Sequence, residues 1–234
     1  MGALPNPPRA GHLYGAEDHG LAALESVTGL WRFKSFQLHA IQIGHLMTDA
    51  TTEELTEFFE FMWHDTEAFV YLPVKTNDGS PLGRWTTFTF SWPRQKAGVV
   101  RHVLKWTSNP DTEVFFAPGM FKTARPAKEA VLGAWVLWVD FDGNAPEDWD
   151  KVTAESHVPR PSLVVQSSIE GHNHCYWALD EFVSNRSVLE DRNRSLAYVL
   201  HADTSGWDAD QILRPIHTIN RKRDMPVHVK EWSE

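Results

Sequence analysis

An apolar run that leads directly into two aspartates constrains the fold of this chain most. Residues 134–139 are all apolar, and Asp140, Phe141, Asp142 and Gly143 follow them at once. A short run of this kind predicts a central strand that is buried on both of its faces. The fold must therefore place this strand inside a sheet, with two carboxylates at its end.

Length and composition limit the remaining choices. The 234 residues are enough for one large domain or two small ones. The longest uncharged apolar run in the middle of the chain, residues 131–139, is far shorter than the ~20 residues that cross a bilayer, so we expect no membrane contact. The single cysteine, Cys175, excludes a disulfide framework or a cysteine-built zinc site within the chain. No signal sequence is visible, and we expect a reducing, cytoplasmic setting.

Helical and strand patterns alternate along the chain, which predicts an α+β fold. The expected helices are residues 18–33, 52–63, 94–106 and a helix from Ser184 or Asn185 to about Leu200. The expected strands are residues 36–44, 68–75, 85–92, 113–117, 134–139, 162–167, 174–179, 212–213 and 227–229. Thr51 and Glu54 form a capping-box pattern, and residues 77–81 form a turn cluster that predicts a hairpin. The Pro-rich residues 1–10 are expected to be flexible.

Charge is distributed unevenly. The net charge is −9, but residues 84–128 hold eight Lys or Arg against two acids, and residues 214–223 hold four against none. Residues 41–70 hold seven acids and no Lys or Arg. Two basic stretches on an acidic body either form a binding surface for a phosphate backbone or a triphosphate, or are scattered solvated charges.

The two aspartates have a chemical and a structural interpretation. Asp140 and Asp142 project together, because alternate residues of a strand lie on one face, about 6.5 Å apart. Two carboxylates so close raise each other's pKa unless a cation lies between them, and such hard oxygen ligands suit Mg²⁺ or Mn²⁺. A solvated turn completed by Gly143 and Asn144 is the structural alternative.

Two later segments carry polar groups that suit phosphate. His172 and His174 share a face if their strand extends back to residue 172, and His174 beside a carboxylate pair is suited to hold an anionic phosphate. A polar loop before a core strand is the alternative. Residues 207–222 combine acids with many phosphate-capable donors, although alone they would indicate a turn before a short strand.

Taken in order, these three segments resemble the archaeo-eukaryotic primase (AEP) superfamily, and most closely the RepB-like primase-polymerases of phages and plasmids. The first segment, Val139-Asp140-Phe141-Asp142, is similar to that family's Asp-x-Asp after a hydrophobic strand. The second is similar to its Ser, short turn and His motif through Ser168 and His174-Cys175-Tyr176-Trp177. The resemblance covers roughly residues 65–230.

The third segment matches the family's last motif with two departures. The matching residues are Trp207, Asp208, Leu213, Arg214, Thr218, Asn220 and Lys222. Ile216-His217 stands where the family has Pro-Gly, and Arg221 stands where the family has His. The resemblance implies an AEP-type core in residues 11–234, a single domain. Its N-terminal α/β lobe (about 11–130) would pack on an RRM-like catalytic lobe (about 131–234), with the active site in the cleft.

For the site, the resemblance implies a two-metal centre. Asp140, Asp142 and Asp208 would bind two divalent ions, Mg²⁺ or Mn²⁺, about 3.5–4 Å apart. One ion would activate the 3′-hydroxyl of the growing strand, and the other would hold the triphosphate of the incoming nucleotide. His174 would contact the triphosphate. Further candidates for phosphate or sugar contacts are Ser168, Arg214, Asn220 and Lys222.

The implied activity is that of a DNA primase or primase-polymerase, joining NTPs or dNTPs on a single-stranded DNA template during phage or plasmid replication. The basic residues 84–128 would follow the template backbone, and some of the 11 Trp would stack on unpaired bases, although most are expected in the core. Family members often carry a helicase after this domain, which implies a helicase domain or partner. A bacterial host cytoplasm is the implied location.

Two other functions remain open from the residues alone. A replication-initiator nickase of the HUH type would use His172 and His174 as a metal pair and Tyr198 as nucleophile, but it leaves Asp140 and Asp142 without a role. A non-catalytic RRM-like module would bind single strands through basic and aromatic residues. The module explains the charge pattern but not three acids combined with a histidine.

Overall fold

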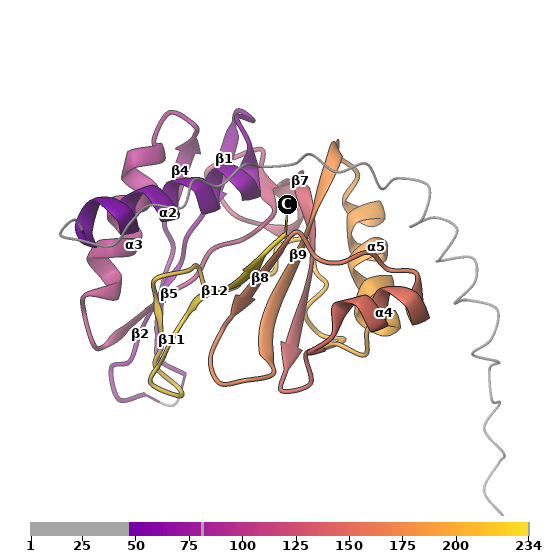
Figure 1. Cartoon of the computed structure of the whole chain (residues 1–234). Coiled ribbons are helices and arrows are strands. Elements are labelled where there is room, and N and C mark those ends of the chain that lie inside the picture. The colour runs from indigo at the N-terminus through magenta and orange to yellow at the C-terminus, as the bar shows by residue number, and fades with distance from the viewer. Residues whose placement is uncertain (1–46, 81, 234) are drawn as a thin grey trace, which may run out of the picture.

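The computed structural model describes residues 47–80 and 82–233 (Figure 1). The expected helix 18–33, the expected strand 36–44 and the proline-rich start lie outside the described residues. The described helices are α2 (Met47–Trp63), α3 (Lys96–Thr107), α4 (Trp149–Ser156), α5 (Arg186–Val199) and the 3₁₀ turn η1 (Lys128–Ala130). The described strands are β1 (Ala68–Tyr71), β2 (Val74–Thr76), β3 (Arg84–Thr86), β4 (Thr89–Trp92), β5 (Thr112–Val114), β6 (Met120–Phe121), β7 (Val131–Asp142), β8 (Leu163–Gln166), β9 (His172–Val183), β10 (Ile219–Asn220), β11 (Met225–Pro226) and β12 (His228–Trp232).

A seven-stranded antiparallel sheet is the centre of the fold. Its strand order is β12-β8-β9-β7-β6-β1-β4, and a smaller sheet has the order β3-β2-β5. From β7 onward, the helices and the strands of the large sheet follow the order βαββαβ, with the β10–β11 hairpin inserted before β12, which pairs with β8. The α+β prediction is confirmed. The large sheet continues across residue 130 because β6 pairs with β7, and the division into two lobes stays a prediction.

The apolar run forms the central strand of this sheet. β7 is twelve residues long, longer than predicted, and it includes both Asp140 and Asp142. Phe141 and the β9 residue Trp177 point to one face, where both rings contact Trp149 of α4 at centroid distances of 6.2 and 6.1 Å. On the opposite face, Tyr176 of β9 contacts Phe58 of α2 at 6.5 Å. Helices therefore cover β7 and β9 on both sides, as the apolar pattern requires.

The predicted hairpin is present but is divided between the two sheets. β1 pairs with β4 in the large sheet, whereas β2 pairs with β3 in the small one. Pro73 lies at the division, and a proline cannot donate a hydrogen bond to a sheet ladder. The predicted strand 113–117 is shorter, Thr112–Val114, and the predicted strand 212–213 is reduced to one bridge between Leu213 and Phe116.

The predicted start of one helix is wrong and that of another is confirmed. The capping-box prediction is wrong, because α2 begins at Met47 and thus contains both Thr51 and Glu54. The apolar stripe of α2 is buried as predicted, with Leu55 and Phe58 fully inaccessible. For α5, the side chain of Asn185 caps the helix by accepting a hydrogen bond from the amide of Val188 at 3.3 Å. Within the described residues, no helix is both long and apolar enough to cross a bilayer.

Candidate active site

Four polar side chains share one face at the paired ends of β7 and β9. The antiparallel register places Asp140 opposite His174 and Asp142 opposite His172. Oδ1 of Asp142 lies 2.8 Å from Nδ1 of His172, and Oδ1 of Asp140 lies 3.7 Å from Nε2 of His174. Residues directly opposite in an antiparallel pair lie on the same face of the sheet. The predicted pairing of the two aspartates on one face, and of the two histidines on one face, is therefore confirmed.

The two aspartates differ in exposure, and burial affects the pKa of Asp140. The Asp142 side chain is 78% exposed, whereas the Asp140 side chain is 28% exposed. Burial, followed by the neighbouring charges of Asp203 and Asp142, raises the pKa of Asp140 to about 7, although Arg214 acts in the opposite direction. An acid in this setting gains from a nearby cation, because a positive charge would offset both its desolvation and the repulsion by its neighbours.

His174 is a buried neutral side chain. Its side chain is 4% exposed, and burial, followed by the charge of Arg214, lowers its pKa to about 3. Its Nδ1 atom is buried. A backbone hydrogen bond with Arg214 acts on the ring and partly opposes the lowering of its pKa by burial.

Glycines hold together the loops beside the acids. The amides of Gly143 and Ala145 donate to the carbonyl of Gly171 at 3.1 and 3.0 Å. Gly171 has a φ of +80°, and a Cβ atom there would lie 2.7 Å from the carbonyl oxygen of Gly143. The loop after β7 and the loop before β9 therefore approach so closely that Gly171 is required, which fixes Asp142 and His172 relative to each other.

The segment after α5 covers the remaining edge of β7. The amide of Asp203 donates to the carbonyl of Asp140 at 2.8 Å, and the amide of Trp138 donates to Oδ1 of Asn193 at 3.1 Å. Sequence reasoning did not single out Asp203 or Asn193. Asp203 lies between the predicted helix and the predicted segment 207–222, and only the fold shows that it lies against the end of β7.

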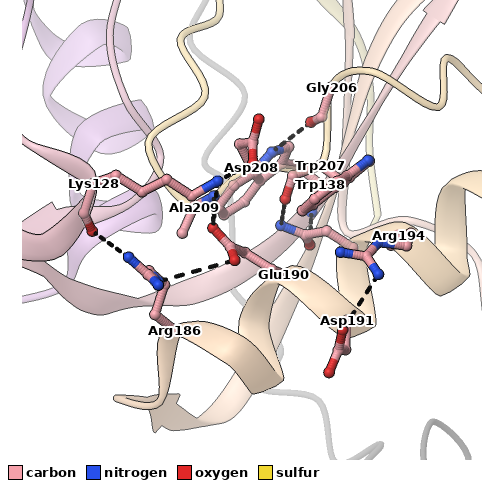
Figure 2. Close-up of polar contacts among 11 residues, drawn as sticks. Lys128, Trp138, Arg186, Glu190, Asp191, Arg194, Gly206, Trp207, Asp208 and Ala209 are labelled. Carbon is pink, nitrogen blue, oxygen red and sulfur yellow. Dashed lines mark hydrogen bonds and ion pairs between the residues drawn. The ribbon is translucent and has the colours of Figure 1, made fainter.

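Asp208 lies in a separate ion-pair cluster (Figure 2). Its carboxylate is bonded to Nζ of Lys128, which is also 3.2 Å from Oε1 of Glu190. Lys128 and Arg194 both lie over the ring of Trp207, with Nζ at 5.5 Å and the guanidinium carbon at 3.9 Å from its centroid. The predicted third acid is therefore neutralised by a lysine, and Lys128 and Glu190 were not predicted as part of the site.

The remaining candidate residues lie around the same strand ends. Arg214 donates to Oε2 of Glu113 at 2.7 Å, and its charge acts on both Asp140 and His174. Asn220 is buried and donates to the carbonyl of Ser167 at 3.1 Å, next to the buried Ser168. Its Oδ1 has no hydrogen-bond partner in the described part of the chain. Lys222 is exposed on the turn between β10 and β11.

His217 occupies the position where the resembled family has glycine. It has a φ of 60°, the left-handed conformation that glycine adopts most easily. Its Nε2 lies 2.6 Å from Oε2 of Glu54 on α2, and its amide donates to the carbonyl of Val227 at 2.9 Å. The backbone of this loop therefore takes a glycine-like conformation without a glycine.

The donor set fits a divalent cation only in part. In residues 47–80 and 82–233, no group of three or more His, Cys, Asp or Glu side chains is arranged to hold a metal. Asp140 and Asp142 fit, because they are hard oxygen donors on one face, and the pKa of Asp140 is raised by burial and by the charges of Asp203 and Asp142. Asp208 could join them only after leaving Lys128. A surface pocket of about 410 Å³ formed by residues of β1, β4 and β6 contains none of the predicted site residues.

Comparison with known proteins supports the fold. The sequence matches no family model and no curated protein. Among solved structures, the AEP domain of the cyanophage S-2L primase-polymerase is similar with a TM-score of 0.58 and 11% identity, over 77% of this chain and 90% of that one. Primase RepB′ is similar with a TM-score of 0.56 and 19% identity, over 78% of this chain and 56% of that one.

A further match has a nucleic acid bound. The catalytic domain of RepB′ in complex with initiator DNA has a TM-score of 0.55 and 19% identity, over 78% of this chain and 85% of that one. At identities this low the similarity concerns the fold alone. The chain therefore has an AEP-type α+β fold, of the kind found in RepB′ and in the cyanophage primase-polymerase.

Proposed function

We propose that this protein is a template-dependent nucleotidyltransferase, a DNA primase or primase-polymerase. One observation carries the proposal. Two aspartates at the end of the central strand of an AEP-type sheet each face a histidine across the strand pair. A solvated turn would not place a buried carboxyl with a pKa of about 7 beside a buried neutral imidazole.

Asp140 and Asp142 are the proposed ligands of two divalent cations, Mg²⁺ or Mn²⁺, with Asp208 as the third acid after its release from Lys128. Such ions, when bound, would lower the pKa of a 3′-hydroxyl and neutralise charge on the leaving pyrophosphate. The raised pKa of Asp140 falls when a cation is near, so the ionised form is the binding form. His172 orients the Asp142 carboxylate through their 2.8 Å contact.

The incoming NTP or dNTP would meet neutral and cationic donors on the same side. His174 is neutral at pH 7, so one ring nitrogen can donate to a phosphate oxygen. Arg214 lies close enough to affect both His174 and Asp140 and would supply a charge-assisted contact. Ser168, Asn220 and Lys222 are proposed phosphate or sugar contacts, and the unpaired Oδ1 of Asn220 suits a hydroxyl donor such as a sugar.

The proposed partner is a single-stranded DNA template, in a phage or plasmid replication setting, and a helicase domain or helicase partner is part of the same proposal. One neighbour in the comparison, the catalytic domain of RepB′, was solved with initiator DNA, which supports a DNA template here. We also propose a cytoplasmic location and a two-lobe organisation of residues 11–234.

Incorporation of labelled nucleotides tests the proposal. The protein is incubated with single-stranded template, NTPs or dNTPs and Mg²⁺ or Mn²⁺, with and without a primer. We expect products that depend on template and metal and that disappear in Asp140→Ala and Asp142→Ala, while both variants keep the wild-type circular dichroism spectrum. Products without primer would identify a primase, and products with primer alone would identify a polymerase.

Other outcomes would favour the two alternatives. Cleavage of the single strand with a covalent adduct on Tyr198 would identify a nickase, and metal-independent binding without synthesis would identify a binding module. No structural observation favours the nickase, because both histidines already face aspartates that it leaves unused.

A further inference from the structure

An exposed tryptophan lies on the small sheet beside the candidate active site. Trp85 of β3 is 48% exposed, and β3 is an edge strand with all three residues exposed. In the register of this sheet Trp85 lies opposite Lys75 of β2, which lies opposite Glu113 of β5. These three side chains therefore share one face of the sheet. An exposed tryptophan at an edge is unusual, because a large apolar ring is normally buried.

A continuous row of contacts connects Trp85 to the acids. The ring of Trp85 lies 5.1 Å from the ring of Phe115, and the guanidinium carbon of Arg214 lies 4.8 Å from the same Phe115 ring. Arg214 is paired with Glu113 and acts electrostatically on Asp140. Phe115 therefore contacts the Trp85 ring and limits its movement, while 48% of Trp85 remains exposed. The row of contacts runs from Trp85 through Phe115 and Arg214 towards Asp140.

Lys75 places a positive charge beside this ring. The Lys75 side chain lies along the sheet against Gly83, and it forms no ion pair with the described residues. Arg221 donates to the carbonyls of Thr107 and Asn109, at 3.1 and 3.3 Å, which fastens the β10–β11 turn to the end of α3. The carbonyl of Asn109 also accepts a hydrogen bond from the hydroxyl of Thr112 at 3.1 Å, so Arg221 is fastened to the segment that leads into β5 of the small sheet. Lys222 and Arg223, which follow Arg221, are exposed on the same turn.

We propose that Trp85 stacks on an unpaired base of the single-stranded template, while Lys75 and the basic β10–β11 turn contact neighbouring phosphates. This inference rests on the proposed function, and it names the surface that holds the template beside the acids. Aromatic stacking on a base stabilises single-strand binding and tolerates every base. A ring already fixed by Phe115 loses little freedom when a base stacks on it.

Fluorescence anisotropy of a labelled oligothymidine at fixed salt tests the proposal. We expect Trp85→Ala to weaken binding roughly ten-fold, and Trp85→Phe to retain most of the affinity, because a smaller ring still stacks. Tyr198→Ala is the matched control, since Tyr198 is an exposed aromatic residue of α5, 62% exposed, outside this surface. A labelled abasic strand of the same length should bind the wild type and Trp85→Ala equally.

Two results would overturn the inference. One is unchanged oligothymidine affinity in Trp85→Ala, and the other is an equal loss on the abasic strand; either would assign Trp85 to packing alone. Absence of single-strand binding by the wild type would overturn it as well. Its failure is distinguishable from failure of the proposed function, because Asp140→Ala should bind template normally and make no product. If Trp85 stacks on a base but the wild type incorporates no nucleotide, the proposed nucleotidyltransferase activity is wrong and the proposed binding surface still stands.

Discussion

His217 has a backbone conformation that is unfavourable for a residue with a side chain. Its φ of 60° lies in the left-handed region, which costs a non-glycine residue roughly 1–2 kcal/mol. The contact between its ring and the Glu54 carboxylate offsets part of this cost, and it connects the loop after Arg214 to α2. A histidine can therefore take the place of the family's glycine, although the sequence alone indicated a change of loop.

Two substitutions of His217 distinguish the cost of its left-handed backbone from the contribution of its contact with Glu54. His217→Ala removes the Glu54 contact and keeps the strain, whereas His217→Gly removes both. We expect the glycine variant to be more stable than the alanine variant by about 1 kcal/mol in urea unfolding. Equal stability of the two variants would mean that the left-handed conformation is not strained here.

Lys128 acts as a resident cation for two acids. It is bonded to Asp208 and lies 3.2 Å from Glu190, whose side chain is 12% exposed. Lys128→Met removes the lysine partner of Asp208 and leaves Glu190 with Arg186 alone, so we expect a loss of about 1 kcal/mol of stability. We also expect Mn²⁺ to raise the melting temperature of this variant more than that of the wild type, because the Asp208 carboxylate becomes free to bind a cation.

Lys151→Met is the matched control for this experiment, because Lys151 forms an exposed ion pair within α4 at 3.9 Å. Its melting temperature should respond to Mn²⁺ as the wild type does. If Mn²⁺ raises the melting temperatures of Lys128→Met, Lys151→Met and the wild type equally, Asp208 is not a ligand of the cation.

At the level of elements, the pair β7–β9 positions the chemistry. Its register gives the aspartates and histidines one face, and its end loops meet at Gly143 and Gly171. Two hydrogen bonds join the loops at the Gly171 carbonyl, and the loops lie so close that a Cβ at residue 171 would collide with the backbone of residue 143. The geometry of the site therefore depends on a close backbone approach as much as on the acids themselves.

Gly171→Ala tests this approach. We expect it to destabilise the fold by about 2 kcal/mol or more, and to reduce nucleotide incorporation, because the loops that carry Asp142 and His172 must move apart. Gly79→Ala is a closely matched control, since Gly79 has a φ of +83° and nothing within 4 Å of the added Cβ. It should lose only about 1 kcal/mol, measured by urea unfolding. Equal losses would show that the contact between the loops is unimportant.

The sequence predicted which segments form helices and which form strands better than it predicted where each one begins and ends. Residue patterns indicated α2, α3 and α5 and the strands β7, β8, β9 and β12, because burial imposes a period on apolar residues. The Thr51 capping box failed because the same residue pattern is compatible with a helix interior. α4 was not predicted, although Asp148 caps it by accepting a hydrogen bond from the amide of Lys151 at 3.0 Å. That Asp was the available signal for this short helix.

In the whole molecule, the candidate site draws on distant parts of the chain. Asp140 comes from β7, Asp203 from the segment after α5, and Arg214 is held by Glu113 of β5. The sequence predicted Asp140, Asp142 and His174 as neighbours because strand alternation and motif order carry that information. It could not assign Lys128 to Asp208, or Asp203 to Asp140, because those contacts depend on how the segment after α5 folds back.

The pH dependence of folding is expected to reflect buried histidines. His102 of α3 is buried among Phe88, Phe90 and Trp106, with Nε2 3.1 Å from the carbonyl oxygen of Leu72. Burial, followed by Lys105, lowers its pKa to about 4 from 6.5. Between these values the unfolded chain binds a proton that the folded chain does not. Stability is therefore full above the unfolded pKa and falls as the pH drops from 6.5 towards 4.

His102→Gln removes this titration and keeps a hydrogen-bond donor for Leu72. We expect the stability difference between wild type and variant to shrink by about 2 kcal/mol from about pH 8 to about pH 5. Asp140 has a raised pKa and contributes with the opposite sign, but both proteins contain it, so its effect cancels. Urea unfolding at the two pH values is the measurement, and a constant difference would mean that His102 has the same pKa in the folded and the unfolded chain.

The most direct test of the account is the binding of Mn²⁺ in the presence of a non-hydrolysable dNTP, measured by electron paramagnetic resonance. The account predicts that the wild type binds about two ions. It predicts that Asp140→Asn, Asp142→Asn and the double variant lose them while remaining folded. Asp180→Asn, an exposed acid near the other end of β9, should bind as the wild type does. Unchanged Mn²⁺ binding in the double variant would contradict the assignment of these acids as the catalytic metal ligands.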